Sequence, residues 1–239
     1  MIDFHSHILP KMDDGPQKVS DCLTMLRRSF LQGVDAMVST SHFYADEEYP
    51  RDFLRRRAEA YAVLQDAMLM SPEVYPRIIL GAEVLYFPGI SEAEDIPSLF
   101  IGNTRTILIE PPMTPWSDMM LDEIARLGVN FDCIPVIAHV DRFMRYLRDD
   151  SLMDRVLQRD MRVQVNAEYF LNPETVEEAI ENLCGDKIHL IGSDCHNLDS
   201  RAPNMGLAMK QARAYGAEAA LKKLHQNAAD LLLWRGRSV

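Results

Sequence analysis

The sequence predicts an α/β protein with a parallel sheet, on three observations. Seven short apolar segments rich in β-branched residues alternate with longer segments of helical period, which is the pattern of consecutive βα units. The short segments are apolar on both faces, as parallel strands covered by helices are. The chain of 239 residues, 47% of them hydrophobic, suffices for one α/β barrel with a sizeable core. We therefore expect one domain over residues 1–239.

Each predicted element follows from its local pattern. The seven predicted strands are residues 2–5, 35–40, 77–84, 106–110, 134–140, 162–167 and 188–194. The clearest helix is predicted at 19–33, where apolar residues recur three and four apart and Gly33 serves as the C-cap. Its segment 20–28 is interpreted as a face packed on the barrel, with an oligomer interface as the alternative. The basic run at 51–60, just before another helical stretch, is interpreted as a solvated helix face.

Composition and charge restrict the partners and the location. A formal net charge of −11 argues against nucleic-acid binding, which requires a basic surface. No apolar run approaches the roughly 20 residues of a membrane span, and the N-terminal stretch MIDFHSH has no basic leader. The four cysteines form no CxxC pair, which is typical of reduced thiols in a cytosol. The sequence therefore predicts a cytoplasmic protein without membrane insertion, and it does not specify an oligomeric state.

Polar side chains occur at the ends of nearly all the predicted strands. In parallel α/β barrels the active site forms at this edge, because the loops that follow the strands converge there. His5 and His7 lie on the same side of the first strand, since the side-chain period of a strand is two. Asp3 shares this side and would either orient a ligand imidazole or make a plain strand-end hydrogen bond. The other candidates at strand ends are His42, Glu83, Glu110, His139, Asp194 and His196.

This set of side chains predicts a metal centre. A lone histidine in an apolar strand is more often a hydrogen-bonded core residue. Two histidines at i, i+2, together with six further His, Asp and Glu residues at strand ends, favour metal binding instead. Nitrogen and carboxylate ligands without a thiolate pair suit Mn²⁺, Fe or Zn²⁺ better than Ca²⁺ or a structural zinc. The ligands outnumber what one ion takes, so we expect two or three ions. A hydroxide activated by such ions predicts metal-assisted hydrolysis, most naturally of a phosphate ester.

Six motifs resemble, in order, those of the polymerase and histidinol phosphatase (PHP) superfamily. They are DFHSH…DDG (3–15), TSH (40–42), GAEV (81–84), LIE (108–110), IAHVDR (137–142) and SDCHNLDSRAP (193–203). Within the superfamily the chain is most similar to the manganese-dependent protein-tyrosine phosphatases encoded with capsule and exopolysaccharide genes of Gram-positive bacteria. The resemblance covers almost the whole chain. It implies a seven-stranded, distorted TIM-like (β/α) barrel, the PHP fold, that holds three metal ions.

The resemblance also implies roles for individual residues. The implied metal ligands are His5, His7, Glu83 and Asp194 for one ion, the bridging Glu83 with Glu110 and His139 for a second, and Asp14, His42 and His196 for a third. Arg142 and Arg201 would bind the phosphoryl group, to which the planar guanidinium fork is suited. The chain departs from the family pattern at Val140 and Asp141, where members have Pro or Ile followed by Glu. Ala202 replaces the first of two frequent prolines.

The functional hypothesis is that the enzyme hydrolyses phosphotyrosine in a substrate protein. The expected substrate is a bacterial tyrosine autokinase, and the expected cofactor is Mn²⁺. Hydrolysis of histidinol phosphate or another small phosphomonoester is the alternative on the same barrel. A non-catalytic scaffold is disfavoured by the intact ligand set. Cys195 and Arg201 have the bare spacing of a cysteine-nucleophile phosphatase, but their loop contains no glycine and includes Asp199. We therefore expect the Cys195 side chain to point away from the metals into the barrel wall.

Overall fold

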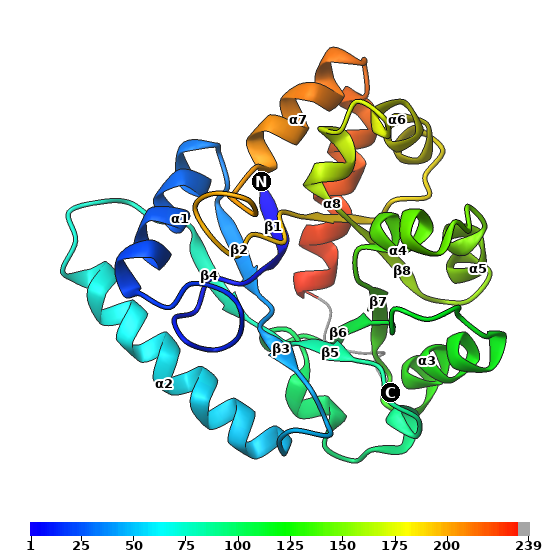
Figure 1. Ribbon diagram of the computed structural model, residues 1–239, viewed down its shortest axis with the longest axis horizontal. Coiled ribbons are helices and arrows are strands. Elements are labelled where there is room, and N and C mark those ends of the chain that lie inside the picture. Colours follow the sequence, from blue (N-terminus) through cyan, green and yellow to red (C-terminus); the bar gives the residue numbers. More distant parts are fainter. Residues whose placement is uncertain (234–239) are drawn as a thin grey trace.

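The computed structural model, which describes residues 1–233, is an α/β fold with a curled parallel sheet (Figure 1). The strands are β1 (Ile2–Ser6), β2 (Ala36–Ser39), β3 (His42–Phe43), β4 (Arg77–Leu80), β5 (Glu83–Leu85), β6 (Thr106–Glu110), β7 (Ile134–Ile137), β8 (Arg162–Asn166) and β9 (Leu190–Gly192). They form two sheets, of order β1-β2-β4 and β3-β5-β6-β7-β8-β9, and every pairing is parallel. Of the predicted domain 1–239, residues 234–239 lie outside the described part.

Helices connect the strands and cover the sheet. They are α1 (Val19–Leu31), α2 (Pro50–Leu69), α3 (Asp118–Asn130), α4 (Val140–Leu147), α5 (Leu152–Leu157), α6 (Val176–Cys184), α7 (Met205–Ala214) and α8 (Glu218–Leu233), with 3-10 turns η1 (Ile90–Glu92), η2 (Ile96–Leu99) and η3 (Ala167–Phe170). The helix predicted at 19–33 is confirmed as α1. Its buried residues, Cys22, Met25, Leu26 and Ser29, recur three and four apart, so this face packs on the sheet as expected. Gly33 follows with a left-handed φ of 87°.

The expectation of one closed seven-stranded barrel is not confirmed. All seven predicted strand segments contain strands, but the short strand β3 follows the second segment outside its predicted bounds, and the third segment is divided into β4 and β5. Strands β2 and β4 pair in the three-stranded sheet, whereas β3 and β5 pair in the six-stranded sheet. The two sheets meet again at β1, where the Asp194 N–H donates to His5 O at 2.8 Å and the His7 N–H to Cys195 O at 2.9 Å.

The chain segments of β1 and β9 pack unusually closely at this junction. A Cβ added to Gly192 would lie 2.4 Å from the Cβ of His5, so only glycine fits there. Asp3 fastens the same junction, because its carboxylate accepts hydrogen bonds from the N–H of Ser193 at 2.8 Å and from its hydroxyl at 2.6 Å. Asp3 thus makes a strand-end hydrogen bond and does not orient a ligand imidazole. The junction fixes His5 beside Asp194.

The apolar interior lies on both sides of the strands. A large cluster joins the sheets to the covering helices, and a smaller one joins residues of five strands to α8, which packs against β1 and β9. Strand and α8 members of the smaller cluster include Phe4, Val38, Leu108, Val136, Leu190, Ala228 and Leu231. These buried apolar side chains form the interior behind the carboxyl ends of the strands, where the predicted ligands lie.

The basic run at 51–60 is a solvated face only in part. It lies inside α2, where Arg51 and Arg55 are exposed. Arg57 instead donates to the carbonyl oxygen of Gly81 at 2.6 Å and is partly buried. Within residues 1–233, no helix has the length and apolar character needed to cross a membrane.

Candidate metal centre

The nine predicted ligand side chains all gather at the carboxyl ends of the strands, around Glu83. One carboxylate oxygen of Glu83, Oε2, lies 3.1 Å from Nε2 of His5 and 3.2 Å from Nε2 of His7. The same oxygen is 3.1 Å from Nδ1 of His42. The other oxygen, Oε1, is 2.8 Å from Nε2 of His139. One buried carboxylate therefore contacts four imidazoles that come from three separate segments of the chain.

The outer members of the set surround this carboxylate. Nε2 of His196 lies 3.1 Å and Nε2 of His42 lies 3.5 Å from Oδ1 of Asp14. On the opposite side, Glu110 Oε1 lies 3.4 Å from Nε2 of His139. His42 faces both groups, because its Nδ1 is 3.8 Å from Oε2 of Glu110. The site is thus one continuous cluster of alternating imidazoles and carboxylates.

Two of the predicted ligands adopt left-handed backbone conformations. Asp194 has a φ of 50° and His139 a φ of 30°, although neither is glycine. Such conformations cost free energy and occur at functional sites, where the surroundings enforce them. In Asp194 the turn directs Oδ1 to within 3.5 Å of Nε2 of His5 and 3.6 Å of Nε2 of His7. The backbone strain therefore serves the arrangement of the cluster.

The donor atoms fit divalent metal ions. Three groups have their ligand atoms within 4.8 Å of one another: His7, Asp14, His42 and His196; His5, His7 and Glu83; and His42, Glu83 and Glu110. In addition, four buried atoms of the cluster make no hydrogen bond of good geometry in the described part of the chain, although all but the third have close polar neighbours: His42 Nδ1, Glu83 Oε2, His139 Nδ1 and His196 Nε2. Buried polar atoms are nearly always paired, and a bound cation satisfies lone pairs that no donor reaches.

The electrostatics of the cluster also favour cations. Burial lowers the pKa of His7, but hydrogen bonds to Asp13 and Glu83 outweigh burial and raise this pKa to about 10. Burial likewise lowers the pKa of His139, and Glu110 and Glu83 raise it to about 9. Although burial raises the pKa of Glu83, the surrounding histidines hold it well below its usual value. Glu83 therefore remains ionised and attracts positive charge to this edge.

Asp13 and Gln164 belong to the site but were not among the predicted residues. Asp13 Oδ2 lies 2.9 Å from His7 Nδ1 and accepts a hydrogen bond from the N–H of His42 at 3.1 Å. Gln164 Oε1 lies 3.2 Å from His5 Nδ1 and accepts from the N–H of His139 at 2.7 Å. Both side chains orient imidazoles, as residues behind metal ligands do. Asp13 could have been found as the neighbour of Asp14.

Asn166 and Asp141 hold the acidic side of the site. Asn166 donates from Nδ2 to Asp194 Oδ2 at 3.0 Å, and its N–H donates to Asp141 Oδ1 at 2.9 Å. Asp141 is buried, and burial raises its pKa to about 6. Asp141, at which the chain departs from the family pattern, thus anchors the end of β8. Gln164 and Asn166 share one face of β8, so polar residues at alternating positions in an apolar strand were the available signal.

The two predicted arginines lie at the rim of the cluster. Arg142 and Arg201 both contact Asp194 Oδ2, Arg201 at 2.8 Å from Nη2. Arg201 also reaches Asp14, with Nη1 at 3.5 Å from Oδ2. Their side chains are 36% and 35% exposed, and both line a cavity of about 490 Å³ that also borders Asp194. The guanidinium groups can therefore contact a molecule in this cavity while they remain beside the cluster.

Cys195 is withdrawn from this cavity. Its side chain is fully buried and belongs to the large apolar cluster. Burial and the nearby charge of Asp3 raise the pKa of the thiol well above its ordinary value. A nucleophilic cysteine requires an accessible, easily ionised thiol, so the environment of Cys195 is the opposite of what that mechanism needs.

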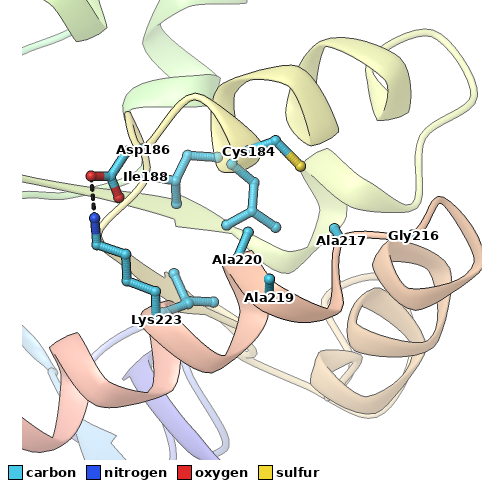
Figure 2. Close-up of a pocket in the computed structure, with 10 residues that line it drawn as sticks. Cys184, Asp186, Ile188, Gly216, Ala217, Ala219, Ala220 and Lys223 are labelled. Carbon is cyan, nitrogen blue, oxygen red and sulfur yellow. Dashed lines mark hydrogen bonds and ion pairs between the residues drawn. The ribbon is translucent and has the colours of Figure 1, made fainter.

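A second hollow of about 400 Å³ lies away from the cluster, between α6 and α8 (Figure 2). It is lined mainly by small and apolar side chains, with the Lys223–Asp186 ion pair at one side. None of the predicted ligands or arginines lines it. The predicted site residues thus lie at the cluster around Glu83 and not at this hollow.

A parallel α/β fold with a buried histidine and carboxylate cluster at the carboxyl ends of its strands, bordered by arginines, defines a metal-dependent hydrolase. The particular family follows from comparison with known proteins. The chain belongs to the CpsB/CapC family of capsular polysaccharide synthesis, whose family model matches residues 1–233.

Individual relatives agree with this family. The tyrosine-protein phosphatase CpsB of Streptococcus pneumoniae is 31% identical over 254 residues, which cover 98% of each chain. The protein of the same name from Streptococcus agalactiae is 29% identical over 97% of this chain and 98% of its own. A crystal structure from the metal-dependent tyrosine phosphatases YwqE of Bacillus subtilis and CpsB of S. pneumoniae matches with a TM-score of 0.84 at 23% identity, over 100% of this chain and 99% of that one.

Proposed function

We propose that this chain is a metal-dependent protein-tyrosine phosphatase, and that its substrate is a bacterial tyrosine autokinase of capsule or exopolysaccharide synthesis. The carrying observation is the clustering of eight ligand-type side chains around Glu83, with two arginines at the rim of an adjoining cavity. Membership of the CpsB/CapC family and relatives named tyrosine-protein phosphatases support the substrate class.

We propose Mn²⁺ as the cofactor, with the nine residues His5, His7, Asp14, His42, Glu83, Glu110, His139, Asp194 and His196 as ligands of up to three ions. Mixed imidazole and carboxylate donors suit Mn²⁺, and Fe or Zn²⁺ remain alternatives. The central position of Glu83, with one oxygen toward His5, His7 and His42 and the other toward His139, supports a bridging role. His7 and His42 each face two groups of donors, which supports closely spaced ions.

The protein side chains bind and orient the phosphoryl group in this proposal. Bound divalent ions supply a hydroxide nucleophile near neutral pH by lowering the pKa of water. Arg142 and Arg201 exchange Asp194 for phosphoryl oxygens and stabilise the charge that develops on them. Gln164 and Asp13 keep the imidazoles in position. Tyrosine is a good leaving group, because its phenol has a pKa of about 10, far below that of an aliphatic alcohol.

An extended polypeptide suits this site better than a small metabolite. The rim of the cavity includes Arg145 and Tyr146, whose side chains are 51% and 59% exposed. A phosphatase of histidinol phosphate or another small phosphomonoester on the same fold is the alternative. We further propose that the whole chain is a single PHP-type domain whose seven strand segments form one distorted barrel. A cytoplasmic location fits its four free cysteines.

A substrate panel tests the proposal. The protein with Mn²⁺ should hydrolyse phosphotyrosine peptides much faster than histidinol phosphate or phosphoserine peptides, and chelation should abolish the activity. Faster turnover of histidinol phosphate would favour the alternative, and full activity in a verified metal-free preparation would refute metal dependence.

Substitution of the arginines tests the phosphoryl-binding role. Arg142→Ala and Arg201→Ala should each lower kcat/KM about a hundredfold, because each removes a donor to the charge that develops in the transition state. Bound metal, measured by elemental analysis, should stay unchanged, because neither side chain is a ligand. Wild-type kinetics in both variants would contradict the assignment.

A further inference from the structure

The cavity beside Asp194 extends outward beyond the residues that the proposed chemistry uses. Asp194, Arg142 and Arg201 border its inner part. The outer part is lined by Arg145, Tyr146, Glu168, Ser200, Ala202 and Asn204. This outer part is where the polypeptide around a phosphorylated residue would lie, and its side chains are therefore positioned to select among substrates.

Helix α4 connects the inner and outer parts. It begins directly after His139, so its N-terminal end is fixed at the metal centre. Arg142, Arg145 and Tyr146 are three and four residues apart and thus share one face of the helix. Arg145 lies about 4.5 Å farther along the helix axis than Arg142. This offset is close to the roughly 3.8 Å between neighbouring residues of an extended peptide.

The exposed Tyr146 ring has no role in holding the described part of the fold together. Its side chain makes no hydrogen bond, ion pair or ring contact with the described residues, and it is 59% exposed. Exposed aromatic rings at the rim of a cavity offer an apolar face to a bound partner and are frequent anchors of recognition. The ring of a phosphotyrosine, held by its phosphate at Arg142 and Arg201, has a matching face.

Arg145 is available to a substrate. Its ion pair is with Glu174, at 3.6 Å between Nη2 and Oε2, and the two side chains are 51% and 81% exposed. Such exposed pairs contribute little free energy and exchange readily. Arg145 is one of three arginines that line this cavity in a chain with a net charge of −11, so the positive charge is local. Three acidic residues also line the cavity: Asp141 and Asp194 in its inner part and the exposed Glu168 in its outer part.

We propose that Arg145 and Tyr146 determine specificity for an acidic phosphotyrosine segment. Tyr146 packs against the substrate ring, and Arg145 leaves Glu174 to bind a carboxylate on the residue next to the phosphotyrosine. Glu168 repels an acidic residue on its side of the cavity. An acidic residue is therefore preferred on only one side of the phosphotyrosine, the side that faces Arg145. The proposal rests on the proposed phosphatase function and adds the sequence context of its substrate.

Two pairs of matched phosphotyrosine peptides test it. One pair carries glutamate or glutamine directly before the phosphotyrosine, and the other pair carries glutamate or glutamine directly after it. The readout is the ratio of kcat/KM for the glutamate peptide to that for the glutamine peptide. The wild-type ratio should be about ten on one side, mainly through KM, and should fall as salt increases. Arg145→Ala should reduce the ratio to about one. Arg148→Ala, which removes an exposed arginine of the same segment that does not line the cavity, should keep it.

The Tyr146 contribution has its own pair of variants. Tyr146→Ala should raise KM severalfold for both peptides, whereas Tyr146→Phe should behave as wild type, because the ring and not the hydroxyl makes the contact. An unchanged ratio in Arg145→Ala, or an equal loss in Arg148→Ala, would overturn the role of Arg145. Unaltered KM in Tyr146→Ala would overturn that of Tyr146. If the wild type hydrolyses neither peptide, the proposed function itself fails, and this inference fails with it.

Discussion

At the residue scale, the site depends on side chains whose protonation is set by their neighbours. Glu83 is buried, yet four imidazoles around it keep it ionised, and Asp13 and Gln164 hold two of those imidazoles from behind. Cys195, only one residue from Asp194 and His196, is excluded from the cluster because its side chain is fully buried in the large apolar core. Neighbours in sequence thus have opposite chemical roles.

Substitutions of these neighbours should separate the two possible nucleophiles. Cys195→Ser is expected to keep most of the activity, because the thiol is buried and its pKa is raised. Asp194→Ala should be nearly inactive, since it removes a contact of both arginines and of three imidazoles. Steady-state kinetics and metal content of the purified variants are the measurements. Complete loss of turnover in Cys195→Ser with metal still bound would contradict the metal-hydroxide mechanism.

His189 should make the fold sensitive to acid. Burial, together with the charges of Arg162 and Lys223, lowers the pKa of His189 to about 4 despite Asp186, and its Nδ1 accepts the N–H of Val163 at 3.2 Å. The unfolded chain therefore binds the proton more readily than the folded one. The stability present above about pH 6.5 is lost as the pH falls toward 4, on the order of 1–2 kcal/mol at pH 5.

The variant His189→Asn keeps an acceptor for Val163 but does not titrate in this range. Urea unfolding at pH 7 and pH 5 should show a smaller loss of unfolding free energy in His189→Asn than in the wild type. Equal losses in both proteins would show that other groups cause the acid sensitivity.

At the element scale, the ends of short strands and the start of α4 position the site. The prediction of strands and helices from period was accurate for α1 and for the existence of seven strand segments. It missed β3 and the division of the third segment into β4 and β5, because an apolar period does not specify which neighbour a strand pairs with. The Thr40 N–H donates to Ser6 O of the three-stranded sheet, and Thr40 O accepts from the N–H of Glu83, which begins β5 of the six-stranded sheet. The chain therefore passes from one sheet to the other at Thr40.

The close approach of β1 and β9 should tolerate no side chain at Gly192. Gly192→Ala would place a Cβ 2.4 Å from the Cβ and 2.8 Å from the N of His5. We expect a loss of about 1–3 kcal/mol or more in unfolding free energy, and reduced metal content because His5 is displaced. Urea unfolding and elemental analysis measure the two effects.

Gly89→Ala is the control for this substitution. Its φ of 90° makes alanine strained, at roughly 1–2 kcal/mol, but its Cβ would meet nothing within 4 Å. It should lose stability and keep its metal. Full metal content in Gly192→Ala would contradict the proposed coupling of the junction to the site.

At the scale of the whole molecule, metal binding should stabilise the fold, because the ligands come from segments that span nearly the entire chain. A ligand at about 100 times its Kd contributes about 2.7 kcal/mol, which corresponds to roughly 5–10 °C in Tm for a chain of this size. Thermal unfolding with Mn²⁺ and after chelation measures this difference. The variant Glu83→Ala should lose most of the Mn²⁺ response. An identical Tm with and without metal in the wild type would contradict the expectation.

The sequence by itself determined the alternation of strands and helices and the residue types at the strand ends, because both are encoded by local period and by position along each segment. Only the tertiary structure decided which polar groups meet. Gln164 contacts His5 across 159 positions of sequence, and Asp3 contacts Ser193 across 190. The division into two sheets and the exposed rim of the cavity were decided in the same way. Contacts of this kind depend on how distant segments pack, and packing free energy is shared among many side chains rather than carried by any one motif.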